Sequence, residues 1–99
     1  MTTIENLDKA FESRVRLGIM SVLTGAGLSD FNTLKTMLGV SDGNLASHIK
    51  ALEELGYIET MKQFIGRKPN TSYSVTEAGQ RAFSAHIEAL ASLLNFKQQ

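Results

Sequence analysis

The 99-residue sequence predicts a mainly α-helical fold with a small β-hairpin, an α+β fold in the order helix, helix, helix, hairpin, helix. Apolar residues recur at helical spacing in four segments, residues 6–23, 29–38, 41–55 and 76–95. Residues 57–75 are instead rich in aromatic and β-branched residues, with the turn-forming stretch GRKPN in their middle. The length predicts a single domain over residues 1–99.

The first two helices have recognisable ends. The first, over residues 6–23, is followed by TGAG, whose two glycines favour a turn. The second begins after Leu28 with Ser29 as its N-cap, and Gly39 ends it. It is a short helix of about ten residues, with apolar side chains along one face.

The third and fourth helices are bounded in the same way. Ser41 caps the third helix and Gly56 stops it, while Thr76 caps the fourth, which runs to about Asn95. Each helix has an apolar stripe, and we expect that of the third helix to be buried. The stripe of the third helix consists of Leu45, Ile49, Leu52 and Leu55, and that of the fourth consists of Phe83, Ile87, Leu90 and Leu94.

A β-hairpin is predicted between these helices. Its strands are YIETMKQFI and TSYSV, and the second alternates so that Thr71, Tyr73 and Val75 share one face. Two short helices joined by the turn GVSD, followed by a hairpin with a basic tip, are the parts of a winged helix-turn-helix. The helix-turn-helix then occupies about residues 29–55, the wing about 57–75, and a C-terminal dimerisation helix about 76–95.

The third helix has an unusual polar face. Gly43, Ser47, Lys50 and Glu54 point away from its apolar stripe, with Asn44 and Ala51 on the flank. Gly43 would let the helix backbone approach another surface, and Asn44 and Ser47 offer short hydrogen-bonding groups. Such groups suit base edges in a DNA major groove, and Lys50 suits a phosphate.

Positive charge is concentrated in the hairpin. The chain has 10 basic and 10 acidic residues, yet residues 60–75 contain Lys62, Arg67 and Lys68 and no acid. Surface fields decay within about 8 Å at physiological salt, so this local charge matters more than the average. We expect Arg67 and Lys68 to neutralise DNA phosphates, or Arg67 to enter the minor groove. Thr71 and Ser72 would add hydroxyl groups for phosphate oxygens.

The segments SDGNLASHIKALEELGYIE and GRKPNTSYSVTEAGQ resemble the small stand-alone winged-helix transcriptional regulators related to the MarR and ArsR groups. The resemblance runs from about Asp8 to Leu94. It implies a homodimeric DNA-binding regulator with the third helix in the major groove and the hairpin as wing. Metal-sensing ArsR relatives have a cysteine pair or a His/Asp ligand cluster that this sequence lacks, so no metal site and no cofactor are expected.

These arguments give two sets of candidate residues. The DNA-binding set is Ser41, Gly43, Asn44, Ser47, His48, Lys50, Arg67, Lys68, Thr71 and Ser72. The last helix has more apolar surface than one small domain hides, which predicts a homodimer interface. The interface set is Leu7, Phe11, Phe83, Ile87, Leu90, Leu93, Leu94 and Phe96.

Several alternatives stay open. His48 either contacts a phosphate or is half-buried and hydrogen-bonded within the helix-turn-helix, while His86 is expected to be structural or exposed. Arg14 and Arg16 are either a solvated face or lie close to the DNA backbone or to a partner subunit. The rival function is a winged helix that binds another protein, whose hairpin would present apolar or acidic groups.

Other function classes find little support. No nucleophile elbow or paired-carboxylate pattern is present, so an enzyme is not expected. A pocket between the first and last helices leaves a small-molecule effector possible, but none is indicated. The absence of cysteine, of a signal-peptide pattern and of a long apolar run predicts a cytoplasmic protein.

Overall fold

The computed structural model describes residues 4–95, which form helices and one antiparallel sheet and confirm the predicted α+β winged-helix fold. The sheet has three strands in the order β1-β3-β2. The elements are the 3₁₀ turns η1 (Ile4–Asn6) and η2 (Lys9–Phe11), then α1 (Arg14–Ala26), β1 (Ser29–Asp30), α2 (Phe31–Leu38), α3 (Asp42–Glu54), β2 (Ile58–Ile65), β3 (Lys68–Val75) and α4 (Glu77–Asn95).

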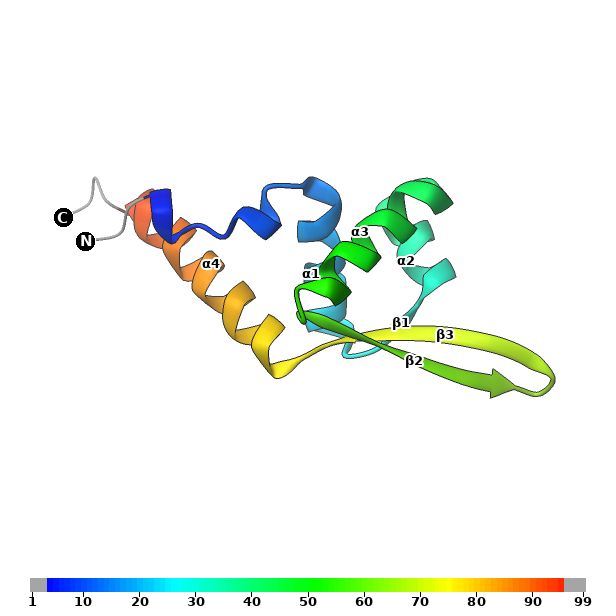
Figure 1. Ribbon diagram of the computed structural model, residues 1–99. Helices are drawn as coiled ribbons and strands as arrows, with labels where there is room; N and C mark the ends of the chain where they lie inside the picture. The colour runs from blue at the N-terminus through cyan, green and yellow to red at the C-terminus, as the bar shows by residue number, and fades with distance from the viewer. Residues whose placement is uncertain (1–3, 96–99) are drawn as a thin grey trace.

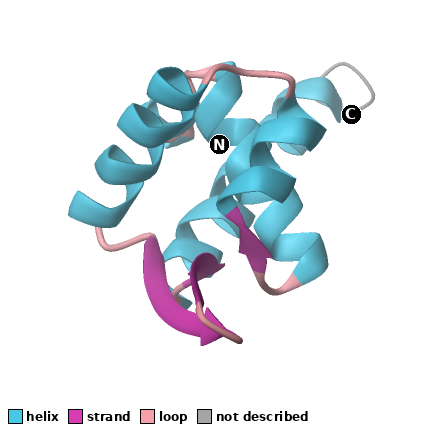
Figure 2. Ribbon diagram, turned by 90° about the vertical axis from the view of Figure 1, so that its right-hand side faces the viewer, coloured by secondary structure: helices cyan, strands magenta, loops and turns pink. Residues whose placement is uncertain are grey.

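The molecule is elongated, with extents of 58 × 25 × 21 Å. Helices α1, α2 and α3 form its middle, α4 extends to one end, and the β2–β3 hairpin extends to the other (Figure 1). Seen from the hairpin end, the long strands lie along one edge of the helical layer (Figure 2). Its radius of gyration is 15.1 Å, above the value of about 13 Å typical of a compact 100-residue domain.

The core lies where α1, α3 and the base of the hairpin meet. Its members are apolar side chains that the helical and strand periods turn inward, and burying each stabilises the fold by about 1.5–3 kcal/mol. The largest fully buried side chains are Ile19, Met20, Leu23, Leu34, Leu45 and Leu52. Ile58 and Tyr73 bring the hairpin base into the same cluster.

A second part of the core is aromatic and holds the N-terminal turns against α4. Phe11 packs edge-on against Phe83, with ring centroids 5.5 Å apart, and against His86 at 5.2 Å. The backbone N–H of Asp8 donates to His86 Nδ1 (3.0 Å), and the hydroxyl of Tyr57 donates to the Asp8 carboxylate (3.0 Å). Burial, with the hydrogen bond to Asp8 and its charge, raises the pKa of Tyr57 above its ordinary value.

The prediction of one helix over residues 6–23 is wrong at both ends. Two capping side chains interrupt the apolar pattern, because Asp8 accepts from the N–H of Ala10 and Ser13 accepts from the N–H of Arg16. Helix α1 therefore begins only at Arg14. It then continues through Gly25 and ends where Gly27 adopts a positive φ of 83°.

The N-cap of α2 also differs from the prediction. Asp30, not Ser29, accepts from the N–H of Thr33 (2.8 Å), and this hydrogen bond lowers the pKa of Asp30. Ser29 and Asp30 form β1, opposite Tyr73 and Ser72 of β3. A strand of two residues is too short to show alternation, so no sequence pattern indicated it.

The predicted start of α3 and the stop signals of the two central helices are confirmed. Ser41 accepts from the N–H of Asn44 (3.2 Å), and Gly39 and Gly56 both have positive φ. Three of the four stripe residues of α3 are buried. Leu55 is the exception, with 50% of its surface exposed, because it lies at the C-cap and turns away from the core.

The hairpin turn is tighter than predicted. Gly66 and Arg67 alone form it, with φ of 66° at Gly66, as in a type II′ turn. Lys68 pairs with Ile65, and Pro69 lies opposite Phe64 within β3. Pairs alternate between hydrogen-bonded and non-hydrogen-bonded after the closing pair, so Pro69 occupies a position where its missing N–H costs no bond to β2.

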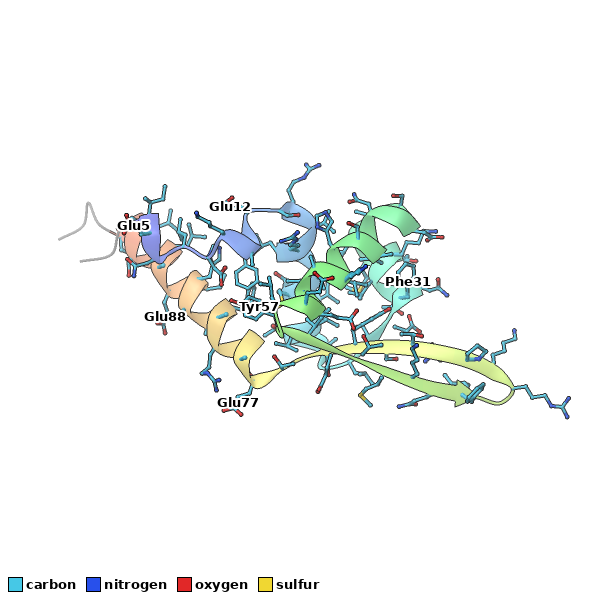
Figure 3. The ribbon with its side chains drawn as sticks, in the orientation of Figure 1. Glu5, Glu12, Phe31, Tyr57, Glu77 and Glu88 are labelled. Carbon is cyan, nitrogen blue, oxygen red and sulfur yellow. The ribbon has the colours of Figure 1, made fainter. Side chains whose placement is uncertain are left out.

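The junction between the hairpin and α4 is close. Thr76 Oγ1 accepts from the N–H of Gly79 (3.0 Å), confirming the predicted cap, and the N–H of Thr76 donates to Tyr57 O (3.0 Å). A Cβ on Gly79 would lie 2.0 Å from that carbonyl oxygen. Tyr57 thus lies between the first turn of α4 and the N-terminal turns (Figure 3).

Candidate nucleic-acid interface

The polar face predicted on the third helix is exposed. Gly43, Asn44, Ser47 and Lys50 are all exposed on α3, and we call these four residues the recognition face. Leu45, Ile49 and Leu52 fix the rotation of α3 by their burial, so the core determines which side chains point outward. The recognition face is therefore held on a rigid element.

Charge at the start of α3 is compensated within the molecule. Asp42 lies beside the recognition face and pairs with Lys35 of α2 at 2.7 Å. Its carboxylate also suits the positive end of the helix dipole. Ser41, predicted to contact DNA, is exposed, and its hydroxyl already accepts the Asn44 N–H as a cap. Its capping role is thus the one that the geometry supports.

His48 is half-buried, as in the second of its two predicted roles, but its hydrogen-bond partner lies on α1 and not within the helix-turn-helix. Its Nδ1 accepts from Nε of Arg16 at 3.1 Å, across the contact between α1 and α3. Arg16 is half-buried as well, while Arg14 is exposed and borders a shallow groove with Asn44. Both arginines were named as candidates from the sequence, but no sequence pattern indicated that they lie beside α3.

The basic tip of the hairpin is fully exposed. We call residues 64–69 the wing tip, and it contains Arg67 and Lys68. No carboxylate within the described residues 4–95 forms an ion pair with either side chain. Lys62, on β2, likewise has no ion-pair partner in the described part of the chain. The wing tip lies well away from the helices (Figure 1).

Thr71 and Ser72, whose hydroxyl groups were predicted to contact DNA, differ in their exposure. Ser72 is buried in β3 between Met61 of β2 and Asp30 of β1, so its candidacy for DNA contact is wrong. Thr71 is half-buried opposite Lys62. The alternation of TSYSV did not indicate that β1 pairs with β3 at Ser72.

The sequence reasoning missed an apolar part of the hairpin. Phe64 and Ile65 are 75% and 65% exposed, and Met61 is exposed as well. Their apolar character was visible in YIETMKQFI, but the imperfect alternation of this strand did not show which of its side chains would be buried. The helices cover only the base of the hairpin, so both faces of its outer half meet solvent.

The predicted dimer residues differ in how far they are buried. Phe11 and Phe83 are buried in the aromatic core of the single chain, which removes them from an interface. Leu7 is half-buried, and Phe96 lies outside the described residues. The remaining four stay exposed on the C-terminal half of α4, with Leu94 73% exposed. We call them the α4 surface, consisting of Ile87, Leu90, Leu93 and Leu94.

Of the apolar stripe predicted on α4, only Phe83 is buried within the single chain. The residues of α4 that are buried are Gly79, Phe83, His86 and Ala89. Beside His86, a groove of about 880 Å³ runs along the N-terminal turns and is lined by Ile4, Leu7 and Lys9, among others. No helix within residues 4–95 has the length and apolar character to cross a membrane.

Comparison with known proteins decides the family. The family model for the winged helix DNA-binding domain matches residues 15–94, which include α2, α3, the hairpin and all but the last residue of α4. The chain belongs to this family. An uncharacterized protein of Methanocaldococcus jannaschii is 40% identical over 85 residues, covering 86% of this chain and 92% of that protein.

Solved structures agree with this winged-helix assignment. A transcriptional regulator homologue from Pyrococcus horikoshii OT3 superposes with a TM-score of 0.79 at 28% identity, covering 97% of this chain and all of that one. A MarR mutant from E. coli, complexed with operator DNA, has a TM-score of 0.74 at 15% identity, covering 86% of this chain and 60% of that one, and is similar in fold. The chain is a winged-helix DNA-binding protein of the transcriptional-regulator type.

Proposed function

We propose that this winged-helix protein regulates transcription as a homodimer that binds specific double-stranded DNA. The recognition face enters the major groove, and the wing tip lies on the backbone or in the adjacent minor groove. The observation that carries this proposal is the pairing of two exposed surfaces on one chain: a small, polar helix face, and a hairpin tip whose Arg67 and Lys68 have no ion-pair partner among residues 4–95.

Gly43 supports a close approach of the α3 backbone to DNA. A Cβ at this position would meet no atom within 4 Å in the free chain, so internal packing does not require glycine there. Glycine inside a helix costs about 0.5–1 kcal/mol relative to alanine. Close contact between DNA and the α3 backbone at Gly43 would explain why glycine is present despite this cost.

The α4 surface supports the dimer. Four large apolar residues on one helix keep between 38% and 73% of their surface exposed in the described part of the chain. Apolar surface of this kind is favourably buried against a second copy under two-fold symmetry. Such a dimer would carry two recognition faces, and a symmetric pair of faces reads a pseudo-palindromic site.

Selection of bound fragments from genomic DNA tests the proposal as a whole. We expect a pseudo-palindrome with half-sites about one helical turn, roughly 10 bp, apart. Sedimentation at micromolar concentration should give twice the chain mass of 10.8 kDa. A single unpaired motif, or a monomer that binds DNA with full affinity, would contradict the dimeric mode.

Asn44 is the side chain we expect to read a base. Asn44→Ala should cost about 1–3 kcal/mol at one base position and relax the preference there. Measuring the affinity for the selected site and for each single-base variant checks this. Equal weakening on all sequences would instead assign Asn44 to the DNA backbone.

Gly43→Ala tests whether glycine at this position is required for the stability of the fold or for DNA binding. It should raise the free energy of unfolding, because alanine favours the helix, and yet weaken DNA binding. Gly25→Ala is the matched control, since Gly25 also lies inside a helix with no atom within 4 Å of an added Cβ. The control should stabilise the fold and leave DNA affinity unchanged.

The exposed Phe64 and Ile65 favour one second candidate, a winged helix that docks on another protein through its hairpin. Retention on immobilised DNA at increasing salt distinguishes the two functions. Binding through phosphates falls steeply with salt, because each phosphate contact releases counterions. Weak retention that does not depend on salt would favour protein docking.

A further inference from the structure

The first turn of α1 lies along one flank of the recognition face. Arg16 reaches His48, with 3.1 Å between Nε and Nδ1, and Arg14 borders the same groove as Asn44. Asn44 and His48 are four residues apart on α3, so they form one row on the helix surface. Two arginines of α1 therefore follow one row of α3.

This flank is opposite to the side that the wing approaches. Thr60 of β2 donates a hydrogen bond to the carboxylate of Glu53, which marks the wing side of α3. At about 100° per residue, Glu53 and His48 fall on opposite sides of the buried Leu45. The recognition face thus lies between the wing on one side and the α1 arginines on the other.

The arginines have their charge available. Within residues 4–95, no carboxylate forms an ion pair with Arg14 or Arg16. Arg16 gives its Nε–H to His48, and its two terminal amino groups remain as donors on the same rigid plane. A major groove is bordered by phosphates on both sides. A helix seated in it needs cations on both flanks to neutralise both strands.

We propose that Arg14 and Arg16 form a second phosphate-binding site, on the DNA strand opposite to the one that the wing contacts. His48 acts as a positioning residue for Arg16 and does not contact DNA. Holding the guanidinium in advance reduces the side-chain entropy lost on binding. This inference rests on the DNA binding proposed above and adds a contact surface outside the recognition face and the wing.

The salt dependence of DNA binding tests the arginines. With one phosphate each, Arg14→Ala/Arg16→Ala removes four contacts per dimer. The slope of log affinity against log salt should become shallower by roughly 3 to 4 units, at about 0.9 per phosphate, with the base preference unchanged. Arg14→Gln/Arg16→Gln keeps the side-chain stems and should give the same result if the alanine pair fails to fold.

Arg81→Ala is the matched control. Arg81 is an exposed arginine of α4 that pairs with Glu77, so its removal should leave the slope unchanged. If the unaltered protein binds its site with a steep salt dependence and both double variants leave the slope unchanged, this inference alone is overturned. Absence of DNA binding by the unaltered protein overturns this inference and the proposed function together.

A double-mutant cycle tests the role of His48. His48→Ala should weaken binding in the unaltered chain but have no further effect when Arg16 is already alanine. His48→Asn offers an acceptor near the position of Nδ1 and should restore most of the affinity. Equal weakening by His48→Ala in both backgrounds would show a direct contact of His48 with DNA and overturn its positioning role.

Discussion

The two ends of the molecule both expose apolar side chains, but they differ in charge. At one end, Ile87, Leu90 and Leu94 are exposed on α4, whose Arg81 and Glu77 neutralise each other. At the other end, Phe64 and Ile65 stand beside Arg67 and Lys68, which have no ion-pair partner among residues 4–95. Figure 1 shows these ends on opposite sides of the central helices.

This difference indicates different kinds of partner. An apolar helix surface without unpaired cations is best covered by a similar surface, since burial of apolar area is non-directional. Apolar side chains among cations suit a polyanion instead, whose phosphates attract the charges while its sugars and base edges offer apolar contact. The exposure of apolar side chains is similar at the two surfaces and does not distinguish them. The charged residues beside those side chains do.

The largest expected effect comes from placing charge on the α4 surface. Leu90→Asp/Leu94→Asp should convert the dimer into a monomer, because two unpaired carboxylates would face their counterparts across the interface. Affinity for a two-half-site fragment should fall by about 10²- to 10⁴-fold, since the second half-site no longer binds intramolecularly. Sedimentation and binding titrations measure both changes.

The control for this variant is Ser92→Asp, which adds a carboxylate to an exposed position on the opposite side of α4. It should leave the dimer and the affinity as they are. A dimer that survives Leu90→Asp/Leu94→Asp would mean that the two ends of the molecule do not differ in the way proposed.

The next effect concerns the charges of the wing tip. Arg67→Ala/Lys68→Ala removes about four phosphate contacts per dimer, so the salt slope of DNA binding should become shallower by roughly 3 to 4 units. The free energy of unfolding should change by less than about 0.5 kcal/mol, because both side chains are exposed. An unchanged salt slope would make this charge cluster an ordinary solvated loop.

A smaller effect is expected where the two ends join. In Gly79→Ala the new Cβ would lie 2.0 Å from the carbonyl oxygen of Tyr57, so the first turn of α4 must shift. We expect a loss of about 1–3 kcal/mol in the free energy of unfolding, measured by chemical denaturation. Gly25→Ala again serves as the control, and equal stability of the two variants would contradict the close packing at this junction.

The smallest effect should come from the apolar part of the wing tip. Phe64→Ser should lower DNA affinity by about 1 kcal/mol, since roughly half of a phenylalanine side chain is available for contact. The salt slope should not change, because no charge is removed. If DNA affinity stays the same, the apolar side chains of the wing tip do not contact DNA, and docking to another protein gains support.

The parts of the fold that depend on local patterns were predictable. Ser41 caps α3, and Leu45, Ile49 and Leu52 recur at helical spacing, so both the helix and its outward face followed from the sequence. The same reasoning failed at Ser13, where the apolar period continues but a capping side chain interrupts the helix. A hydrogen bond from one side chain can end an element that periodicity would extend.

Features that join distant segments were not predictable. The two residues of β1 pair with Tyr73 and Ser72 more than 40 positions later, and their own sequence has no strand character. Arg16 and His48 meet because α1 and α3 cross at one place. The exposure of Phe64 depends on how far the hairpin extends past the helices. Each of these features depends on how the helices and strands pack against one another, which local sequence patterns do not indicate.

Pro69 has a further consequence, for the solubility of the protein. β1 covers β3 only at Ser72 and Tyr73, so the outer half of β3 has an open edge that no strand within residues 4–95 pairs with. Open edges are templates for pairing with strands of other molecules and so for aggregation. Pro69 presents its ring to this edge in place of an N–H donor, and Lys68 places a charge next to it. The protruding hairpin is thereby protected against edge-to-edge assembly.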